Sequence, residues 1–353
     1  MTLTSVELFA GAGGLALGVE KAGFRSLATV EWNKWACDTM RNNIAHGNPL
    51  VKNWNVIEED VREFNWDSLK ESVDLLAGGP PCQPFSLGGL SRADQDKRDM
   101  FPALISVVNQ LKPKAFIVEN VKGLLRKQFS DYYRYILLRL QNPGCEQESG
   151  EDWRDHLVRL SEIDLPTSAN DDLRYDVYWK LINAADYGVP QKRERVIIVG
   201  FRADLKVDWS FPPPTHSKTG NPGKGLLAWR TVRDAIGDLP QPVTDGCGEY
   251  FNHQFRKGAK VYPGHTGSDL DKPSKTIKAG VHGIPGGENM LIQDDGNPRY
   301  YTVREAARIQ TFPDDYRFDG AWSEAMRQLG NAVPVRLAEI MAKEVAKRLE
   351  SRI

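Results

Sequence analysis

The chain has 353 residues, and its 46 Lys and Arg nearly balance its 47 Asp and Glu, for a formal net charge of −1 at pH 7. This length exceeds the size at which a single hydrophobic core stops growing, so we expect one large domain and a smaller one. The near-zero charge excludes a global attraction to polyanions, so such a partner would have to meet a local basic patch. The sequence has no run of about 18 apolar residues that could span a membrane.

The four cysteines are widely spaced, at positions 37, 82, 145 and 247, and form no C-x-x-C pair. This spacing argues against a zinc site and against a disulfide framework, and it is typical of a reducing compartment. His253 and His265 also lack metal-ligand spacing, so we expect no metal. A strand pattern begins almost at once, without the basic and apolar regions of a signal peptide. We therefore expect a cytoplasmic protein.

Strand-like and helix-like stretches alternate over the first 200 residues, which predicts a doubly wound α/β sheet. The predicted strands cover residues 6–9, 27–30, 73–77, 115–118 and 195–200, and the predicted helices cover 14–22, 33–43 and 100–111. Between residues 141 and 172 this pattern lapses, and nine Asp and Glu stand against two Arg. We interpret that segment as an acidic surface insertion, which would face away from a nucleic acid.

The pattern changes near Trp209, where Phe211-Pro212-Pro213-Pro214 indicates a domain boundary. Gly and Pro stay dense as far as Pro298, which predicts a small, loop-rich second domain. Helical periodicity returns at residues 302–311 and 334–351. In the last of these helices one apolar residue recurs at every fourth position, which predicts a stripe that docks on the large domain. The stripe consists of Leu337, Met341, Val345 and Leu349.

A glycine-rich turn, Gly11-Ala12-Gly13-Gly14, follows the first strand and opens a helix. Backbone N–H groups in such a turn can approach a ligand closely. Glu31 lies twenty residues beyond Gly11, at the end of the next strand, where a carboxylate accepts hydrogen bonds from ribose hydroxyls. The two features indicate a cofactor that contains adenosine. They do not identify it, because NAD-binding proteins carry the same pattern.

Cys82 lies in the segment Gly78-Gly79-Pro80-Pro81-Cys82-Gln83, directly after the strand predicted at residues 73–77. The two prolines stiffen the backbone before the thiol. Open α/β sheets place their chemistry at the carboxyl ends of strands, which is where this turn lies. Most free cysteines are small buried apolar side chains, so the thiol alone does not establish catalysis.

Five motifs stand in order along the chain: Phe9-Ala10-Gly11-x-Gly13-Gly14, Gly79-Pro80-Pro81-Cys82-Gln83, Val118-Glu119-Asn120, Gln191-x-Arg193-x-Arg195 and Gly330-Asn331-Ala332-Val333-Pro334. In this order they resemble the cytosine carbon-5 DNA methyltransferase family, whose layout the chain follows from Val6 to about Val345. Glu31-Trp32, Asp60-Val61 and the stretch from Tyr301 to Arg308 also fall where that family has motifs.

The resemblance implies a Rossmann-like methyltransferase fold that uses S-adenosylmethionine: a doubly wound mixed sheet with a second, smaller, loop-rich domain. Residues 1–208 plus 318–353 would form the catalytic and cofactor-binding domain. Residues 209–317 would form the small target-recognition domain.

The resemblance also implies a mechanism. Carbon-5 of cytosine is a poor nucleophile, and addition of a thiolate at carbon-6 turns the ring into an enamine that can attack an electrophilic methyl group. Cys82 would be the thiolate. Glu119 would hold or protonate ring nitrogen 3, and Arg195 would support the carbonyl oxygen. Arg193 would order this loop or contact phosphate.

S-adenosylmethionine is the methyl donor that the resemblance implies, with S-adenosylhomocysteine as product. Glu31 would bind the ribose, Trp32 would cover the adenine face, and Asp60 would accept from the adenine amino group. The full expected cofactor site consists of Phe9, Ala10, Gly11, Gly13, Gly14, Glu31, Trp32, Asp60, Val61, Pro80, Asn331 and Val333.

Duplex DNA is the expected partner, and the target base must be flipped out because carbon-6 is buried in the stack. The segment from Ser86 to Asp99 would act as a mobile lid. Between Asn252 and Pro285 six Lys and Arg stand against two Asp, which predicts phosphate and groove contacts there. The expected DNA contacts are Ser86, Arg92, Arg98, Arg256, Lys257 and Lys260.

Alternatives remain at this stage. An NAD-dependent dehydrogenase would explain the glycine turn and Glu31, but not the Pro-Pro-Cys-Gln segment or the second domain. A non-catalytic DNA-binding protein would not need the intact Cys82, Glu119 and Arg195. A transfer-RNA cytosine methyltransferase shares the motifs, although the long region from Trp209 to Pro298 favours DNA. We expect a monomer of a prokaryotic modification system; any cognate restriction endonuclease would share its target site without a stable complex.

Overall fold

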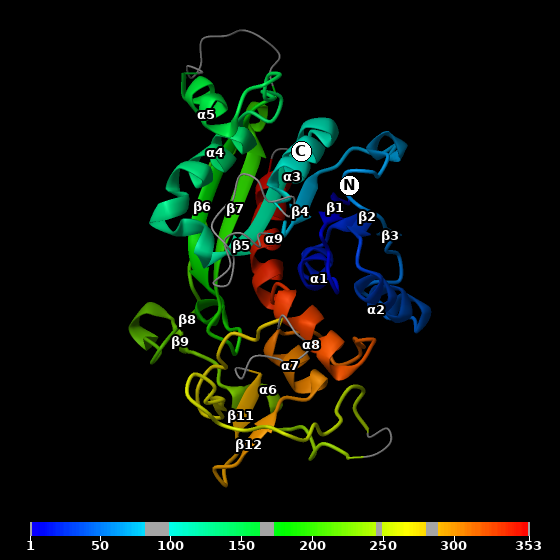
Figure 1. Cartoon of the computed structure of the whole chain (residues 1–353), viewed down its shortest axis with the longest axis vertical. Coiled ribbons are helices and arrows are strands. Elements are labelled where there is room, and N and C mark those ends of the chain that lie inside the picture. The colour runs from blue at the N-terminus through cyan, green and yellow to red at the C-terminus, as the bar shows by residue number, and fades with distance from the viewer. Residues whose placement is uncertain (1, 82–98, 163–172, 245–248, 280–288, 352–353) are drawn as a thin grey trace.

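The computed structural model describes residues 2–81, 99–162, 173–244, 249–279 and 289–351, and it divides into a large sheet-containing part and a smaller part below it (Figure 1). The large part is built on a seven-stranded sheet in the order β3-β2-β1-β4-β5-β7-β6. The strands are β1 (Thr4–Leu8), β2 (Arg25–Glu31), β3 (Val56–Glu58), β4 (Leu75–Gly78), β5 (Ala115–Val121), β6 (Tyr175–Asn183) and β7 (Glu194–Arg202).

Six of the seven strands run in the same direction, and β7 runs antiparallel to both of its neighbours, so the sheet is mixed. The chain builds outward from β1 to β3 and then crosses back to β4, on the other side of β1. The strand order therefore reverses between β1 and β4. In open α/β sheets, ligands bind at the carboxyl ends of the strands beside such a switch point.

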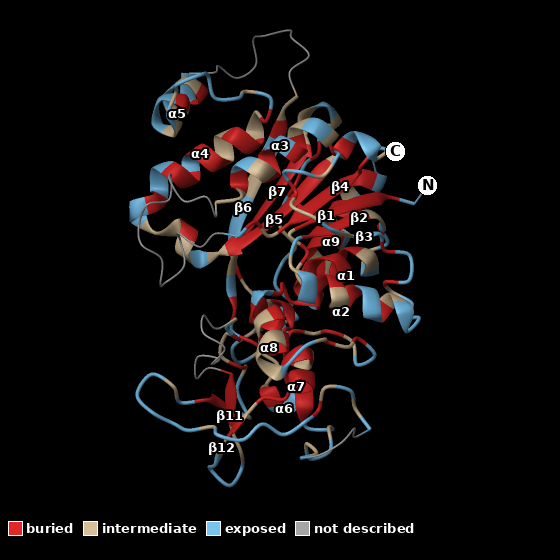
Figure 2. Cartoon of the chain, turned by 45° about the vertical axis from the view of Figure 1, so that its right-hand side comes forward, coloured by how far each residue is buried: buried red, intermediate tan, exposed pale blue. Residues whose placement is uncertain are grey.

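Helices cover both faces of the sheet (Figures 1 and 2). On one face α3 (Phe101–Leu111) and α4 (Ser130–Gln141) pack against alternate strand residues such as Val6 and Leu76. On the other face α1 (Gly14–Lys21) and α9 (Val335–Glu350) cover the intervening residues, such as Leu75 and Ala77. The helix α2 (Lys34–Ala45) flanks the β2–β3 side.

The smaller part contains short elements joined by long loops (Figure 1). They are β8 (His216–Ser217), β9 (Leu227–Ala228), α6 (Val232–Ile236), β10 (Ser268–Asp269), β11 (Met290–Ile292), β12 (Pro298–Tyr300), α7 (Val303–Ile309) and α8 (Trp322–Asn331). Its apolar core is continuous with the glycine turn, because Ala10 and Leu17 belong to the same cluster as Tyr301 and Leu329. The boundaries at residues 209 and 317 stay a prediction; α8, which follows the second of them, packs beside α7.

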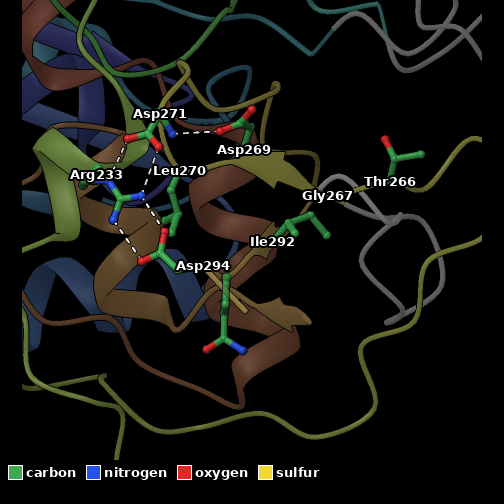
Figure 3. A pocket seen from close by; sticks show the side chains of 9 residues that line it. Arg233, Thr266, Gly267, Asp269, Leu270, Asp271, Ile292 and Asp294 are labelled. Atoms are coloured by element: carbon green, nitrogen blue, oxygen red, sulfur yellow. Dashed lines mark hydrogen bonds and ion pairs between the residues drawn. The ribbon is translucent and has the colours of Figure 1, made fainter. Parts of the chain in front are cut away.

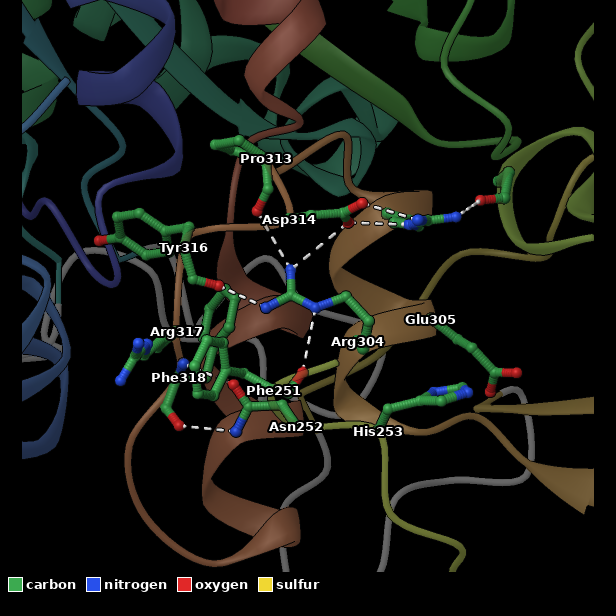
Figure 4. Close-up of polar contacts among 12 residues, drawn as sticks. Phe251, Asn252, His253, Arg304, Glu305, Pro313, Asp314, Tyr316, Arg317 and Phe318 are labelled. Carbon is green, nitrogen blue, oxygen red and sulfur yellow. Dashed lines mark hydrogen bonds and ion pairs between the residues drawn. The ribbon is translucent and has the colours of Figure 1, made fainter. Parts of the chain in front are cut away.

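Arg304 organises the loops of the smaller part (Figure 4). Its guanidinium is buried and donates to the carbonyl oxygens of Phe251 (3.1 Å), Pro313 (3.1 Å) and Tyr316 (2.6 Å). Burial lowers its pKa to about 10. Three carbonyls from two loops thus share one cation, which explains why a loop-rich segment keeps a defined shape.

The mixed α/β sheet and the predicted elements of the first 200 residues are confirmed, with shifts of one to three residues at most ends. The apolar stripe of α9 is also confirmed, since its four residues are at most 1% exposed. Sequence patterns did not predict β3, β6, α4, α5 (Trp153–Glu162) and α8. The edge strand β6 buries only its ends, Tyr175 and Ile182, so its sequence lacks a clear alternation.

The acidic segment is not structureless, because α5 lies within it and packs on α4. Its buried contact includes His156, whose ring nitrogen Nδ1 lies 3.0 Å from the hydroxyl of Tyr135. Because the buried residue His156 is polar, the sequence of α5 lacks the apolar periodicity that would predict a helix. In the described part of the chain, no helix is long and apolar enough to cross a membrane.

Gly18 on α1 tests the packing of the first helix against the last. A Cβ atom at this position would lie 2.3 Å from the Cβ of Ala338 and 2.6 Å from the nitrogen of Glu339. Helix propensity alone predicts that Gly18→Ala stabilises the protein by up to about 1 kcal/mol. We expect the opposite, a loss of about 1–3 kcal/mol in the free energy of unfolding, because two backbones must move apart.

Urea unfolding measures this difference, with Gly223→Ala as the control, because a Cβ there meets its nearest atom at 3.5 Å. The control should stay within about 0.5 kcal/mol of the wild type. A Gly18→Ala protein as stable as the wild type would refute the close contact between α1 and α9.

Candidate active site

The glycine turn leaves β1 through three residues in the left-handed region: Phe9 (φ 54°), Gly11 (φ 55°) and Gly13 (φ 81°). At Gly11 a Cβ atom would find nothing within 4 Å, so open space lies beside the backbone there. At Gly14 the same atom would lie 2.5 Å from the carbonyl oxygen of Val333. Gly14 is thus required for the far end of the chain to reach the turn.

Glu31 ends β2 beside this turn, and its side chain is nearly buried. One carboxylate oxygen accepts from the backbone N–H of Gly11 and the other from that of Asn33, both at 2.8 Å. Burial raises the pKa of Glu31, while these N–H donors act in the opposite direction. The neighbouring Trp32 is 72% exposed, which is unusual for an indole and leaves its aromatic face accessible.

Arg327, on α8, is a residue of this site that the sequence analysis missed. Its guanidinium donates to the side-chain oxygen of Asn33 (3.1 Å) and pairs with Glu324 (2.6 Å). Burial raises the pKa of Glu31, and the positive charge of Arg327 opposes this rise. No sequence spacing could indicate it, because only the fold brings α8 to the start of α2.

The other expected cofactor residues lie at the ends of β3 and β4. Asp60 is held by Arg62, which donates to both carboxylate oxygens at 2.9 and 2.5 Å and lowers the pKa of Asp60. Val61 is buried, and its carbonyl accepts from the indole of Trp66 at 3.1 Å. Pro80 is buried at the end of β4.

Glu119 and Arg195 form an ion pair of 2.7 Å, and both side chains are nearly buried, at 10% and 13% exposure. Glu119 lies on β5 and Arg195 on the adjacent antiparallel strand β7. A Cβ atom on Gly79 would lie 3.4 Å from Glu119 Oε2, so this pair lies against the turn that leads to Cys82. Asn120 fixes that turn, because its amide donates to the carbonyl of Pro80 at 3.1 Å.

Four predicted site residues, Cys82, Ser86, Arg92 and Arg98, lie outside the described residues. The described chain approaches them as far as Pro81, which is exposed, and continues at Asp99.

Arg193 is 1% exposed and donates to the carbonyls of Ile277 (3.1 Å), Gly330 (2.9 Å) and Ala332 (2.9 Å). Burial lowers its pKa well below the ordinary value. A contact with DNA phosphate requires an exposed guanidinium, so the geometry gives Arg193 a positioning role instead. It joins the smaller part and the last motif to the start of β7.

The segment Gly330–Pro334 is fixed by glutamines as well as by Arg193. Gln310 donates to the carbonyls of Leu329 (2.5 Å) and Ala332 (3.2 Å), and it accepts from Gln191 at 3.0 Å. Of the two expected cofactor residues in this segment, Asn331 is exposed and Val333 is buried beside Gly14. Gln310 is a second residue that sequence reasoning missed, since its partners are distant in the chain.

The predicted DNA contacts Arg256, Lys257 and Lys260 are exposed on one loop of the smaller part. The guanidinium of Arg256 lies 5.5 Å from the ring centre of Trp322. His253 lies within the same basic stretch, but it is buried (Figure 4). Its ring nitrogens lie 2.9 Å from Thr302 Oγ1 and 2.8 Å from the carbonyl of Pro240, so it supports the loop and is not available to DNA.

A surface hollow of about 280 Å³ lies elsewhere, in the smaller part (Figure 3). Arg233 lies across it and pairs with Asp271 (2.7 Å) and Asp294 (2.6 Å). The hollow contains none of the predicted site residues. Its one lining cation is already neutralised by two carboxylates, so we assign it no role in binding an anion.

The chain is similar to known proteins along nearly its whole length. The family model for C-5 cytosine-specific DNA methylase matches residues 3–148 and 166–347. The chain belongs to this family. A type II methyltransferase of Neisseria gonorrhoeae, M.NgoMIV, is 34% identical over 361 residues, covering 99% of both chains. Another, M.MthTI of Methanothermobacter thermautotrophicus, is 32% identical over 378 residues, with the same coverage of both.

Among solved structures, a DNA modification methyltransferase encoded in a prophage (E. coli) is similar over 99% of both chains, with a TM-score of 0.67 and 23% identity. A structure of Dnmt2 methyltransferase from S. pombe has a TM-score of 0.61 and 18% identity, over 99% of this chain and 98% of that one. Both likenesses concern the fold. Together with the family match, they make this chain a DNA cytosine-5-methyltransferase with a Rossmann-like methyltransferase fold.

Arg193 can be tested as the residue that joins the parts of the methyltransferase. Arg193→Met should lower the free energy of unfolding by about 3 kcal/mol or more, because several buried carbonyls lose their donor. Lys192→Met is the matched control: it changes the adjacent, exposed cation and should cost less than about 0.5 kcal/mol. Equal stability of the two variants in guanidinium titrations would contradict the positioning role.

Proposed function

We propose that this methyltransferase moves a methyl group from S-adenosylmethionine to carbon-5 of a cytosine flipped out of a specific duplex DNA sequence. Cys82 adds to carbon-6 in this reaction. The observation that carries the proposal is the ion pair of Glu119 and Arg195 against the turn that leads to Cys82. The pair lies at the carboxyl edge of the sheet, where the glycine turn also lies.

The residues beside the glycine turn fit the expected cofactor. Glu31 presents a fixed carboxylate suited to ribose hydroxyls, Trp32 an accessible aromatic face suited to adenine, and the backbone at Gly11 borders open space. Asp60 and Pro80 would complete the adenine site, and Asn331 would close it from the far end of the chain. Bound there, S-adenosylmethionine supplies the electrophilic methyl group.

The protein groups then act on the cytosine. The Cys82 thiolate forms a bond to carbon-6, and the displaced electron pair makes carbon-5 nucleophilic. Glu119 holds ring nitrogen 3 and Arg195 supports the carbonyl oxygen, so the charge that develops on the ring meets two fixed partners. After methylation a base removes the proton from carbon-5, and the thiolate leaves carbon-6 to restore the aromatic ring.

Duplex DNA is the proposed substrate, bound with Arg256, Lys257 and Lys260 on the smaller part and with Ser86, Arg92 and Arg98. The curated relatives are type II methyltransferases by name. This supports a role as the modification enzyme of a restriction–modification system. A cognate endonuclease would recognise the same sequence, and the methyltransferase would act as a monomer.

Bisulfite sequencing of DNA from cells that express the protein tests this function directly. Protected cytosines should fall within one short sequence. Transfer RNA from the same cells distinguishes the alternative RNA substrate, since a transfer-RNA methyltransferase would protect cytosine there instead. A melting assay distinguishes the dehydrogenase: S-adenosylhomocysteine should raise the melting temperature, and NAD should not.

Cys82→Ser should abolish methylation but leave S-adenosylhomocysteine binding nearly intact. The serine hydroxyl is not ionised at neutral pH and adds poorly to the pyrimidine. Duplex DNA with 5-fluorocytosine at the target position should trap the wild type covalently, because fluorine cannot leave carbon-5 as a cation. The mechanism is wrong if Cys82→Ser keeps more than about a thousandth of the wild-type rate, on the scale of a lost nucleophile.

Glu31→Ala and Trp32→Ala should each weaken S-adenosylmethionine binding by about 1–3 kcal/mol, the size of a lost charge-assisted hydrogen bond or stacking face. Two nearby residues serve as controls. Glu58 lies beside Glu31 in the strand register but pairs with Arg41, and Trp35 is half-exposed on the first turn of α2. Calorimetry should find near wild-type affinity for both controls, and unchanged affinity in both test variants would remove Glu31 and Trp32 from the pocket.

A further inference from the structure

One segment at the start of the smaller part has an unusual charge pattern. Asp and Glu make up 47 of the 353 residues, so a stretch of 25 residues would carry about three of them. The stretch from Trp209 to Arg233 carries none, while it includes Lys218, Lys224 and Arg230. This bias exceeds that of residues 252–285, where two Asp accompany the basic residues.

Two of these cations are available to a ligand. Lys218 and Lys224 are exposed, and in the part of the chain that the structure describes neither takes part in an ion pair. Arg233, by contrast, already pairs with two aspartates. Arg230 is half-buried, and its guanidinium donates to the carbonyl of Asp234 at 3.1 Å.

The loop that carries both lysines has a defined shape. Asn221 and Leu226 exchange two backbone hydrogen bonds of 2.8 and 2.9 Å, which close a tight turn with Lys224 inside it. The base of the loop is fixed to the 3-10 turn Ala184–Tyr187, since Asp186 accepts from Trp229 Nε1 (2.8 Å) and from the N–H of Thr215 (3.0 Å). The lysines therefore project from a fixed base.

This base lies beside the candidate active site. Lys192 is exposed, and its ammonium lies 5.4 Å from the ring centre of Trp229. Three residues further on is Arg195, the partner of Glu119. In Figure 1 the strands β8 and β9 lie below the lower ends of β6 and β7, at the end of the smaller part that is nearer the sheet. Exposed cations thus extend from Lys192, near the candidate active site, to Lys218 and Lys224 on the loop.

We propose that Lys218 and Lys224, with Lys192 at the base of the loop, form a phosphate-contacting surface for the backbone of the substrate duplex. This surface rests on the proposed function and is separate from the loop of Arg256, Lys257 and Lys260. Exposed cations without a protein partner bind phosphates with release of counterions, so each contact adds to the salt dependence of binding. Backbone contacts of this kind set the position of the duplex without reading its sequence.

The test compares duplex binding by Lys218→Ala/Lys224→Ala with that of the wild type, by fluorescence anisotropy from about 50 to 200 mM salt. The slope of log K against log salt should become shallower by up to about 1.8, or about 0.9 for each lost phosphate contact. The affinity for S-adenosylhomocysteine and the urea midpoint should not change. The matched control, Lys52→Ala/Lys70→Ala, removes two exposed lysines that precede β3 and β4, outside the stretch from Trp209 to Arg233, and should keep the wild-type slope.

An unaltered slope in Lys218→Ala/Lys224→Ala would overturn the proposal, as would an equal change in the control. Bisulfite sequencing with the wild type distinguishes a failure of this proposal from a failure of the proposed function. If the wild type methylates cytosine and the slope is unaltered, only the phosphate-contacting surface fails. If the wild type leaves DNA unmethylated, the proposed function fails whatever the slope.

Discussion

The candidate active site depends on the contact between the first turn of the chain and a segment more than 300 residues later. Gly14 allows the carbonyl of Val333 to approach to a distance that any side chain would block. Arg193 and Gln310 hold the same segment from the other side through its carbonyl groups. Because buried carbonyls must be paired, these donors determine where residues 330–334 lie. The proposed methyl-donor pocket, with walls from both ends of the chain, depends on this contact.

Electrostatics at the site depend on groups that are paired before any ligand arrives. Glu31 receives two backbone N–H groups, and Glu119 receives the guanidinium of Arg195. A buried carboxylate without such partners would be costly in free energy and would take up a proton. Preorganised partners also avoid reorganisation when charge develops on a substrate. The same arrangement therefore stabilises the fold and serves the proposed chemistry.

Local patterns predicted much of this structure. Apolar periodicity located the main strands and helices of the first 200 residues, and glycine and proline located the turns at Gly11 and Pro80. Family motifs pointed to Glu31, Glu119 and Arg195, which the fold places along one edge of the sheet. Proximity between distant elements left no local signal, so Arg327 and Gln310 could not be predicted.

Some polar residues that the sequence would place at the surface are buried in the structure. The resemblance allowed Arg193 a phosphate contact, and His253 lies in the basic stretch of residues 252–285, yet both are enclosed and hydrogen-bonded to backbone or hydroxyl groups. The helix α5 was missed for a related reason, since His156 occupies an inward position that an apolar residue would have marked. The type of a residue indicates which interactions its side chain can make. Its burial and its hydrogen-bond partners determine whether a ligand can reach that side chain.

The central claim is that the two ends of the chain form one cofactor pocket. Hydrogen–deuterium exchange with and without S-adenosylhomocysteine tests it most directly. Peptides that cover residues 9–14 and residues 330–334 should gain protection together, at the same ligand concentration, while peptides of α5 should not change. Protection of residues 9–14 alone would contradict the claim, because the far segment would then pack against the turn without taking part in the pocket.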